Sequence, residues 1–359
     1  MQTDPQPDQS PDRPDAAPAG GAVPAPRPRL DVVAVGNALV DVLGTARDED
    51  LEALDLVKGT MAIVDHARSE AIYATMGPTT EASGGSAANT MAGVAALGGR
   101  AAYLARVADD QWGQVFTHDI RSIGVAFDPK PTPAVPGRVV TGHCLVLMTG
   151  DAERTMATHL GVSGEFGSGD LHLDHLTSAQ VVYLEGYLWE QPSAKAAMRE
   201  AIDTAHASDA AVALTVSDPF CVQHHRDEFL ELLDGDLEIL FANEDEVMML
   251  FGSADFDAAV EAVTETGVLA VLTRGAAGCV VVTAAGPVSV PAAPVERVVD
   301  TTGAGDLFAA GFLYGMTNGL SPEDSARLGG ICAAEVISHV GARPLADLRS
   351  LAAEAGLLG

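Results

Sequence analysis

The apolar positions of the chain fall into short runs that alternate with longer stretches rich in helix-forming residues. Short apolar runs with many β-branched residues predict buried strands. Several of them are almost continuously apolar, which is typical of strands that are covered on both faces of a sheet. We expect strands at 31–36, 101–107, 143–149, 181–187, 211–217, 237–243, 268–275 and 279–284.

The stretches between these runs predict helices. The helix that follows Pro192 begins at a preferred position for proline, and an earlier helix ends before Gly98 and Gly99. Regular alternation of strand and helix predicts an α/β fold with a mostly parallel sheet. We expect helices at 86–97, 193–207, 227–233, 244–251, 306–319 and 322–341.

Two segments interrupt this alternation and divide the chain. Residues 44–66 and the Pro- and Gly-rich residues 124–142 are expected to supply short strands of a small β lid over one edge of the sheet. Residues 1–29 are rich in Pro and Asp and predict a disordered tail. We therefore expect one domain over residues 30–345, followed by a C-terminal helix or tail at 346–359.

Composition and charge exclude several classes of protein. The chain has 359 residues and a formal net charge of −30, so binding to nucleic-acid phosphates is not expected. The sequence shows no apolar run long enough to predict a membrane span and no secretory h-region near its first residue. The four cysteines are far apart, which predicts reduced thiols and a cytoplasmic protein.

The segment VVDTTGAGDLFAAGFLYG, residues 298–315, carries the strongest chemical signal. Gly303, Ala304 and Gly305 are small enough to let an anion approach the backbone at the start of a helix. The N–H groups there, together with the helix dipole, would form an anion hole. Asp306 would lie in the first helical turn, where it either caps the helix or acts as a general base for an attacking hydroxyl.

This segment resembles the C-terminal signature of the ribokinase-like (PfkB) sugar and nucleoside kinases, D-T-x-G-A-G-D. A second signature of that family is similar to residues 83–116, and the resemblance covers residues 30–345. It implies a three-layer α/β/α domain with a β lid, a small-molecule acceptor, ATP and Mg²⁺, and a monomer or homodimer. It assigns Asp306 as the base.

The resemblance also implies the residues that bind the acceptor. Gly84 and Gly85 would form a hinge between the lid and the larger domain, where an ordinary tight turn is the alternative. Asn89 would bind hydroxyl groups of the acceptor. Asp41, a lone carboxylate in an apolar stretch, would hold two neighbouring hydroxyls, and a surface position after the strand is its alternative.

Residues 141–161 resemble the adenosine-kinase branch of the family, which has T-G-x-C followed by T-G-D-x-x-R. Arg154 matches the arginine that reaches the transferred phosphate from the lid, and a solvated loop charge is the alternative. Cys144 would line the base pocket. Tyr187 would stack on adenine, with packing in the core as the alternative.

Further motifs match positions that bind the nucleotide and cations. Asn243 and Glu246 are spaced to lie on one face of a first helical turn, where they would bind Mg²⁺ through water or simply cap the helix. The resemblance further implies that Thr273 and Gly275 contact the nucleotide. It also implies a monovalent-cation site at Asp300 and Thr302, which could take K⁺.

Together these features predict an ATP-dependent kinase of a primary hydroxyl, with the 5′-hydroxyl of adenosine as the expected acceptor. A sugar kinase acting on ribose, fructose or a similar ring is the alternative, because Thr302 replaces an Asn that is common in the adenosine-kinase branch. A binding protein without activity is the alternative from another class. Such a protein should have lost Asp306 or the glycines beside it, and both glycines are present.

Overall fold

The computed structural model describes residues 1, 29–135, 137–151 and 153–359, so the predicted tail lies almost entirely outside the described residues. Within them an eight-stranded sheet has the order β13-β12-β11-β10-β9-β8-β1-β5. All neighbouring strands from β5 to β11 pair in parallel, and β12 and β13 are antiparallel. The strands are β1 Leu30–Val35, β5 Ala101–Leu104, β8 Ala179–Glu185, β9 Ala211–Thr215, β10 Ile239–Asn243, β11 Leu269–Thr273, β12 Cys279–Thr283 and β13 Gly286–Val290.

Helices cover both faces of this sheet, which explains the continuous apolar runs of its strands. Alternate residues of β1 belong to different cores: Val32 packs on one face and Val33 on the other. The first face carries α3 Ser86–Ala96, α4 Gln111–Ser122, α10 Ala304–Thr317, α11 Pro322–Val336 and α12 Leu348–Glu354. The second carries α5 Leu173–Leu176, α6 Pro192–His206, α7 Pro219–Leu233, α8 Glu244–Phe251 and α9 Phe256–Thr266.

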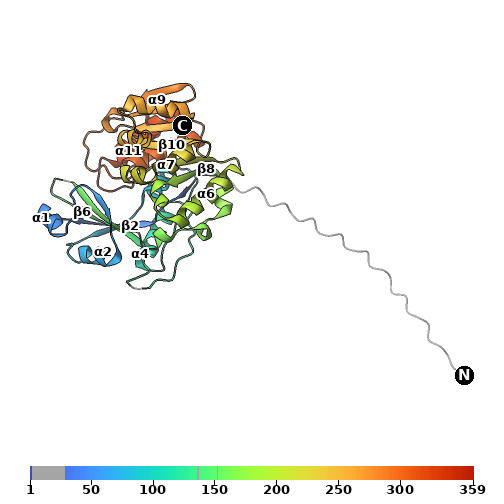
Figure 1. Cartoon of the computed structure of the whole chain (residues 1–359). Helices are drawn as coiled ribbons and strands as arrows, with labels where there is room; N and C mark the ends of the chain where they lie inside the picture. Colours follow the sequence, from blue (N-terminus) through green and yellow to red (C-terminus); the bar gives the residue numbers. More distant parts are fainter. Residues whose placement is uncertain (2–28, 136, 152) are drawn as a thin grey trace.

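A second, smaller sheet forms the lid. In the described residues it has five strands in the order β3-β7-β6-β2-β4, and it lies beside the larger body in Figure 1 with the labels β2, β6, α1 and α2. Its elements are β2 Leu39–Thr45, α1 Asp48–Ala53, β3 Met61–Ile63, α2 His66–Tyr73, β4 Thr80–Gly84, β6 Gly142–Met148 and β7 Arg154–His159. Short 3-10 helices complete the fold at Gly161–Glu165, Ser168–Asp170, Gly186–Glu190 and Gly275–Ala277.

The lid differs in detail from the expectation. Segment 44–66 supplies the end of β2, α1 and β3, but segment 124–142 supplies only the first residue of β6. Ala126 bridges to Ala102 on β5, so that segment follows the edge of the main sheet. The apolar run 143–149, expected as one of the buried strands, is β6 of the lid. The C-terminal helix α12 packs into the main core through the fully buried Leu348 and Ala352, so the domain extends beyond residue 345.

Candidate active site

The start of α10 forms the centre of the candidate site. Gly303 is its N-cap, with φ of 78°, and a Cβ there would lie 2.8 Å from that of Ala342, so both conformation and space favour glycine. The first N–H groups of a helix have no acceptor within it. The N–H of Ala304 donates to the Thr301 carbonyl at 3.2 Å. Residues 303–306 all line a cavity of about 300 Å³.

Asp306 points from this turn toward α3. Its two carboxylate oxygens accept hydrogen bonds from the Ser86 hydroxyl at 2.7 Å and from the Asn89 side-chain amide at 2.9 Å. Burial raises the pKa of Asp306, and these two bonds and Arg343 oppose that effect. Within the described residues the side-chain oxygen of Asn89 is buried without a hydrogen-bond partner. It is therefore available to a hydroxyl donor beside Asp306.

Asp41 and Cys144 face the same region from the lid. They are register neighbours on β2 and β6, and Gly84 on β4 gives the Asp41 carboxylate room that a side chain would take. Burial raises the pKa of Asp41 to about 6, although Arg343 and Arg154 lower it. Burial also raises the pKa of Cys144 to about 12, so its thiol stays protonated.

Gly85 marks the crossing from the lid to α3. Its φ is 92°, and a Cβ there would overlap the Asn37 carbonyl oxygen, which lies in the crossing from β1 to β2. Two lid connections thus touch at a position that only glycine fits. Gly85 therefore lies where the lid joins the body, and its role as a hinge stays a prediction.

Arg154 reaches from β7 of the lid to the body. It forms an ion pair with Asp300, whose side chain is buried, while the side chain of Arg154 is partly buried. Asp300 also accepts hydrogen bonds from the N–H groups of Thr302 at 3.0 Å and Gly341 at 2.8 Å. The guanidinium therefore lies near the start of α10 rather than in solvent. Because it already neutralises Asp300, the arrangement does not fit a monovalent cation at that carboxylate.

Arg343 is a second cation of the site. Its guanidinium donates to the Ala88 carbonyl at 2.6 Å and to the Ser83 carbonyl at 3.3 Å. Its charge lowers the pKa of both Asp41 and Asp306. Arg343 therefore helps to keep the carboxylates of Asp41 and Asp306 ionised although both are buried from solvent.

Asn243 and Glu246 line the same cavity as Asp306 and form a capping box at the start of α8. Each backbone N–H donates to the other residue's side chain, and the Asn243 amide donates to Glu246 at 2.7 Å. Burial raises the pKa of Glu246 to about 7. Since their oxygens are engaged, these residues fit Mg²⁺ through bound water and not as direct ligands. The described residues contain no cluster of three metal-ligating side chains.

A second cavity, of about 660 Å³, adjoins the first. Thr273 and Gly275 line it, together with apolar residues of 291–298 and α11. The two cavities share Thr273, Thr301, Ala304, Gly305 and Phe308 in their walls. Both are lined by residues of the larger body, and the start of α10 lies at their border, whereas Asp41, Asn89 and Cys144 line neither of them.

Comparison with known proteins defines the family. A model of the pfkB family of carbohydrate kinases matches residues 50–348. The chain belongs to this family. The ribokinase-like fold is thereby confirmed, and this pfkB kinase is a phosphotransferase with an alcohol group as acceptor, in a family that uses ATP.

Its relatives include nucleoside and sugar kinases. The chain is 29% identical over 335 residues to adenosine kinase of Saccharomyces cerevisiae, covering 86% of this chain and 95% of the yeast protein. It is 48% identical to the adenosine kinase of Sinorhizobium meliloti, with a TM-score of 0.86 and coverage of 91% and 99%. A probable sugar kinase of Rhizobium etli CFN 42 is 44% identical, with a TM-score of 0.87 and coverage of 92% and 99%.

Tyr187 lies apart from the other predicted residues of this pfkB kinase. It packs against the core of the second face, and its backbone N–H donates to the Ser217 hydroxyl at 3.3 Å. Burial, together with the nearby carboxylate of Asp218 at the start of α7, raises the pKa of its phenol. The structure therefore does not bring Tyr187 together with Asp41 and Cys144.

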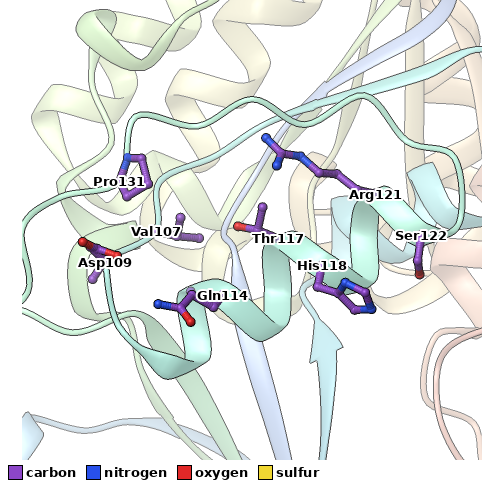
Figure 2. A pocket seen from close by; sticks show the side chains of 10 residues that line it. Val107, Asp109, Gln114, Thr117, His118, Arg121, Ser122 and Pro131 are labelled. Carbon is purple, nitrogen blue, oxygen red and sulfur yellow. The ribbon is translucent and has the colours of Figure 1, made fainter.

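A further cavity, of about 530 Å³, lies along α4 (Figure 2). Gln114, Thr117 and Arg121 face it from the helix, and Pro131 faces it from the loop. No predicted site residue lines it. The part of the chain that the structure describes also has no helix long and apolar enough to span a membrane.

The sequence analysis missed two polar residues of the site, Ser86 and Arg343, and the buried Glu185 beside it, whose carboxylate accepts hydrogen bonds from Asn37 and Ala87. Glu185 carried a usable signal, because it is a lone carboxylate at the end of an apolar strand, the same argument that singled out Asp41. Arg343 contacts Ser83, which lies 260 positions away. The sequence around either residue cannot predict such a contact.

Proposed function

We propose that the protein transfers the γ-phosphoryl group of ATP to the 5′-hydroxyl of adenosine and forms AMP. One observation carries the proposal: the Asp306 carboxylate lies at the start of α10 and is held by Ser86 and Asn89 on the acceptor side. A general base must be within hydrogen-bond reach of the proton that it accepts. Donors for the transferred phosphoryl group must lie beside it.

Acceptor binding follows from the groups around Asp306. The two oxygens of Asp41 suit the neighbouring 2′- and 3′-hydroxyls of a ribose. The unpartnered oxygen of Asn89 can accept another hydrogen bond from the acceptor. The ring would then lie between the lid strand β2 and helix α3, with its primary hydroxyl toward Asp306.

The transfer step needs positioning and charge stabilisation more than covalent chemistry. The acceptor oxygen forms a bond to the γ-phosphorus, and the bond from that phosphorus to the oxygen of ADP breaks. Asp306 takes the hydroxyl proton, and the N–H groups at the start of α10, other than that of Ala304, stabilise the charge of the phosphoryl group. The ion pair with Asp300 keeps Arg154 near that place from the lid side. Arg154 would add positive charge to the phosphoryl group by exchanging Asp300 for it.

The donor would occupy the larger cavity beside Thr273 and Gly275, with its phosphates toward α10. Asn243 and Glu246 would hold Mg²⁺ through water. When bound, that ion neutralises charge on the phosphates of ATP.

The adenosine kinases of Sinorhizobium meliloti and Saccharomyces cerevisiae among the relatives support adenosine as the acceptor. A free sugar is the second candidate, because the Rhizobium etli relative at 44% identity is described as a probable sugar kinase. An assay of phosphate transfer from ATP to adenosine, other nucleosides, ribose and fructose separates them. We expect the highest kcat/KM with adenosine and a 5′-phosphate as product. A higher kcat/KM with a free sugar would overturn the acceptor while leaving the kinase activity intact.

A further inference from the structure

The chain crosses between the lid and the body at several places, and a buried carboxylate touches two of them. Glu185 is the last residue of β8 in the body and is 1% exposed. One of its oxygens accepts hydrogen bonds from the backbone N–H of Asn37 at 3.3 Å and from the Asn37 side-chain amide at 3.0 Å. The other oxygen accepts the Ala87 N–H at 2.9 Å.

These two partners lie in different crossings. Asn37 lies between β1 of the body and β2 of the lid, and Ala87 follows β4 of the lid in the first turn of α3. A third crossing joins the network after β7, where the Ser163 hydroxyl donates to the side-chain oxygen of Asn37 at 2.6 Å. That bond engages the oxygen of the Asn37 side chain, so its NH₂ group faces Glu185. The three crossings are therefore fixed relative to one another.

The backbone at Gly36 is built around this carboxylate. A Cβ there would collide with Glu185, lie 2.7 Å from that of Ala87 and lie 3.0 Å from the Tyr103 hydroxyl. Asn37 and Ser163 are themselves 3% and 1% exposed. A hydrogen-bond network without access to water strongly favours one geometry, because a buried donor that loses its acceptor is unfavourable.

From this geometry we propose that Glu185 is a positioning residue that fixes the lid's crossings in the orientation that binds the acceptor. It acts through Asn37 and Ala87 and does not need to touch the acceptor. The donor cavity is lined by residues of the body only, so Glu185 should govern acceptor binding and not donor binding. The inference about acceptor binding rests on the proposed kinase activity.

Glu185→Gln tests this role, because a glutamine has one acceptor oxygen and places an NH₂ group against an N–H donor. Asp31→Asn is the matched control. Asp31 is also a buried carboxylate that accepts three hydrogen bonds, from Arg100 and Gln180, but it lies at the opposite end of β1 from the lid. Ser163→Ala is a milder variant that breaks only the link to the third crossing.

The first measurement is hydrogen exchange of the free enzyme, which needs no substrate. We expect faster exchange in peptides covering 34–40 and 84–91 in Glu185→Gln, and in 160–166 in Ser163→Ala, with wild-type rates there in Asp31→Asn. Hydrogen exchange at the wild-type rate at these crossings in both Glu185→Gln and Ser163→Ala would overturn the proposal. If Glu185→Gln does not fold, Ser163→Ala decides it.

The second measurement is steady-state kinetics with whichever acceptor the wild type phosphorylates best. We expect the acceptor KM of Glu185→Gln to rise about tenfold, since fewer molecules have the binding-competent lid, and the KM for ATP to change less than about twofold. An equal rise in both constants, or the same change in Asp31→Asn, would show that Glu185 only stabilises the fold. An inactive wild type would refute the proposed activity, whereas the exchange result would still test the hinge.

Discussion

At the scale of single residues, the site depends on two carboxylates held near one guanidinium. Burial raises the pKa of Asp41 and of Asp306, and Arg343 lowers both. Both carboxylates must be ionised, Asp306 to accept a proton and Asp41 to accept hydroxyl hydrogen bonds. The charge of Asp306 also raises the pKa of Asp41, by less than burial does.

Replacing Arg343 with methionine should therefore make the enzyme more sensitive to acid. Without the guanidinium the pKa of both carboxylates rises, so the fall of kcat/KM on acidification begins at a higher pH. We expect a loss of roughly tenfold at pH 6 and a smaller loss at pH 8. The measurement is the pH profile of kcat/KM, with Arg121→Met as a control far from the site. A parallel loss at every pH would mean that Arg343 acts through packing alone.

Sequence analysis found the residues of the site that belong to motifs, such as Asp306, Asn89 and Asp41, and the structure brings these three to one region. It missed Arg343 because its partners come from distant parts of the chain. It also missed that Arg154 and Asp300, predicted for two different ligands, are partners of each other. Which charged residues pair depends on the folded structure, so the sequence around Arg154 or around Asp300 cannot predict this ion pair.

At the scale of elements, Gly85 is the most constrained point of the lid. Its positive φ and its contact with the Asn37 carbonyl would both oppose a side chain. Gly124 offers a comparison at the same φ of 92°, with no atom within 4 Å of its Cβ position. The ψ of Gly85 is 131°, which lies outside the left-handed helical region.

Gly124→Ala should lower the free energy of unfolding by about 1–2 kcal/mol, the cost of the backbone conformation. Gly85→Ala should lower it by about a further 1–3 kcal/mol, because the new methyl group displaces the neighbouring crossing and because its backbone conformation suits an L-residue poorly. Denaturant unfolding of the two variants measures the difference. Equal losses would mean that the crossings do not pack closely at Gly85.

Most strands and helices of the larger body could be predicted because they carry an apolar pattern of their own. The sequence analysis did not predict β13, whose three central residues are exposed, nor the helices α4 and α9. The lid could be predicted only in outline. Strand β4 reads Thr-Glu-Ala-Ser-Gly, with its first two residues exposed, so no apolar run marks it. Segment 124–142 has the prolines and glycines of an irregular connection, and which sheet it follows depends on tertiary contacts.

At the scale of the whole molecule, the acidic composition is the dominant feature. The chain has 50 Asp and Glu residues against 20 Lys and Arg residues. Such an excess of one sign destabilises the compact state by self-repulsion.

Salt should therefore stabilise the enzyme by screening. We expect the Tm to rise by about 2–4 °C between low salt and 0.3 M NaCl, which corresponds to about 1 kcal/mol. KCl should act equally, because screening does not depend on which monovalent cation supplies it. A rise with KCl alone would point to a bound potassium ion and contradict the ion pair of Arg154 with Asp300 as the resting arrangement.

The central claim is that the α10 N–H groups hold the phosphoryl group while Asp306 takes the acceptor proton. Turnover of Asp306→Asn with adenosine and ATP, measured together with calorimetric binding of adenosine, tests it most directly. The account predicts a fall in kcat of about a thousandfold or more, with adenosine affinity retained. Turnover close to that of the wild type would contradict it.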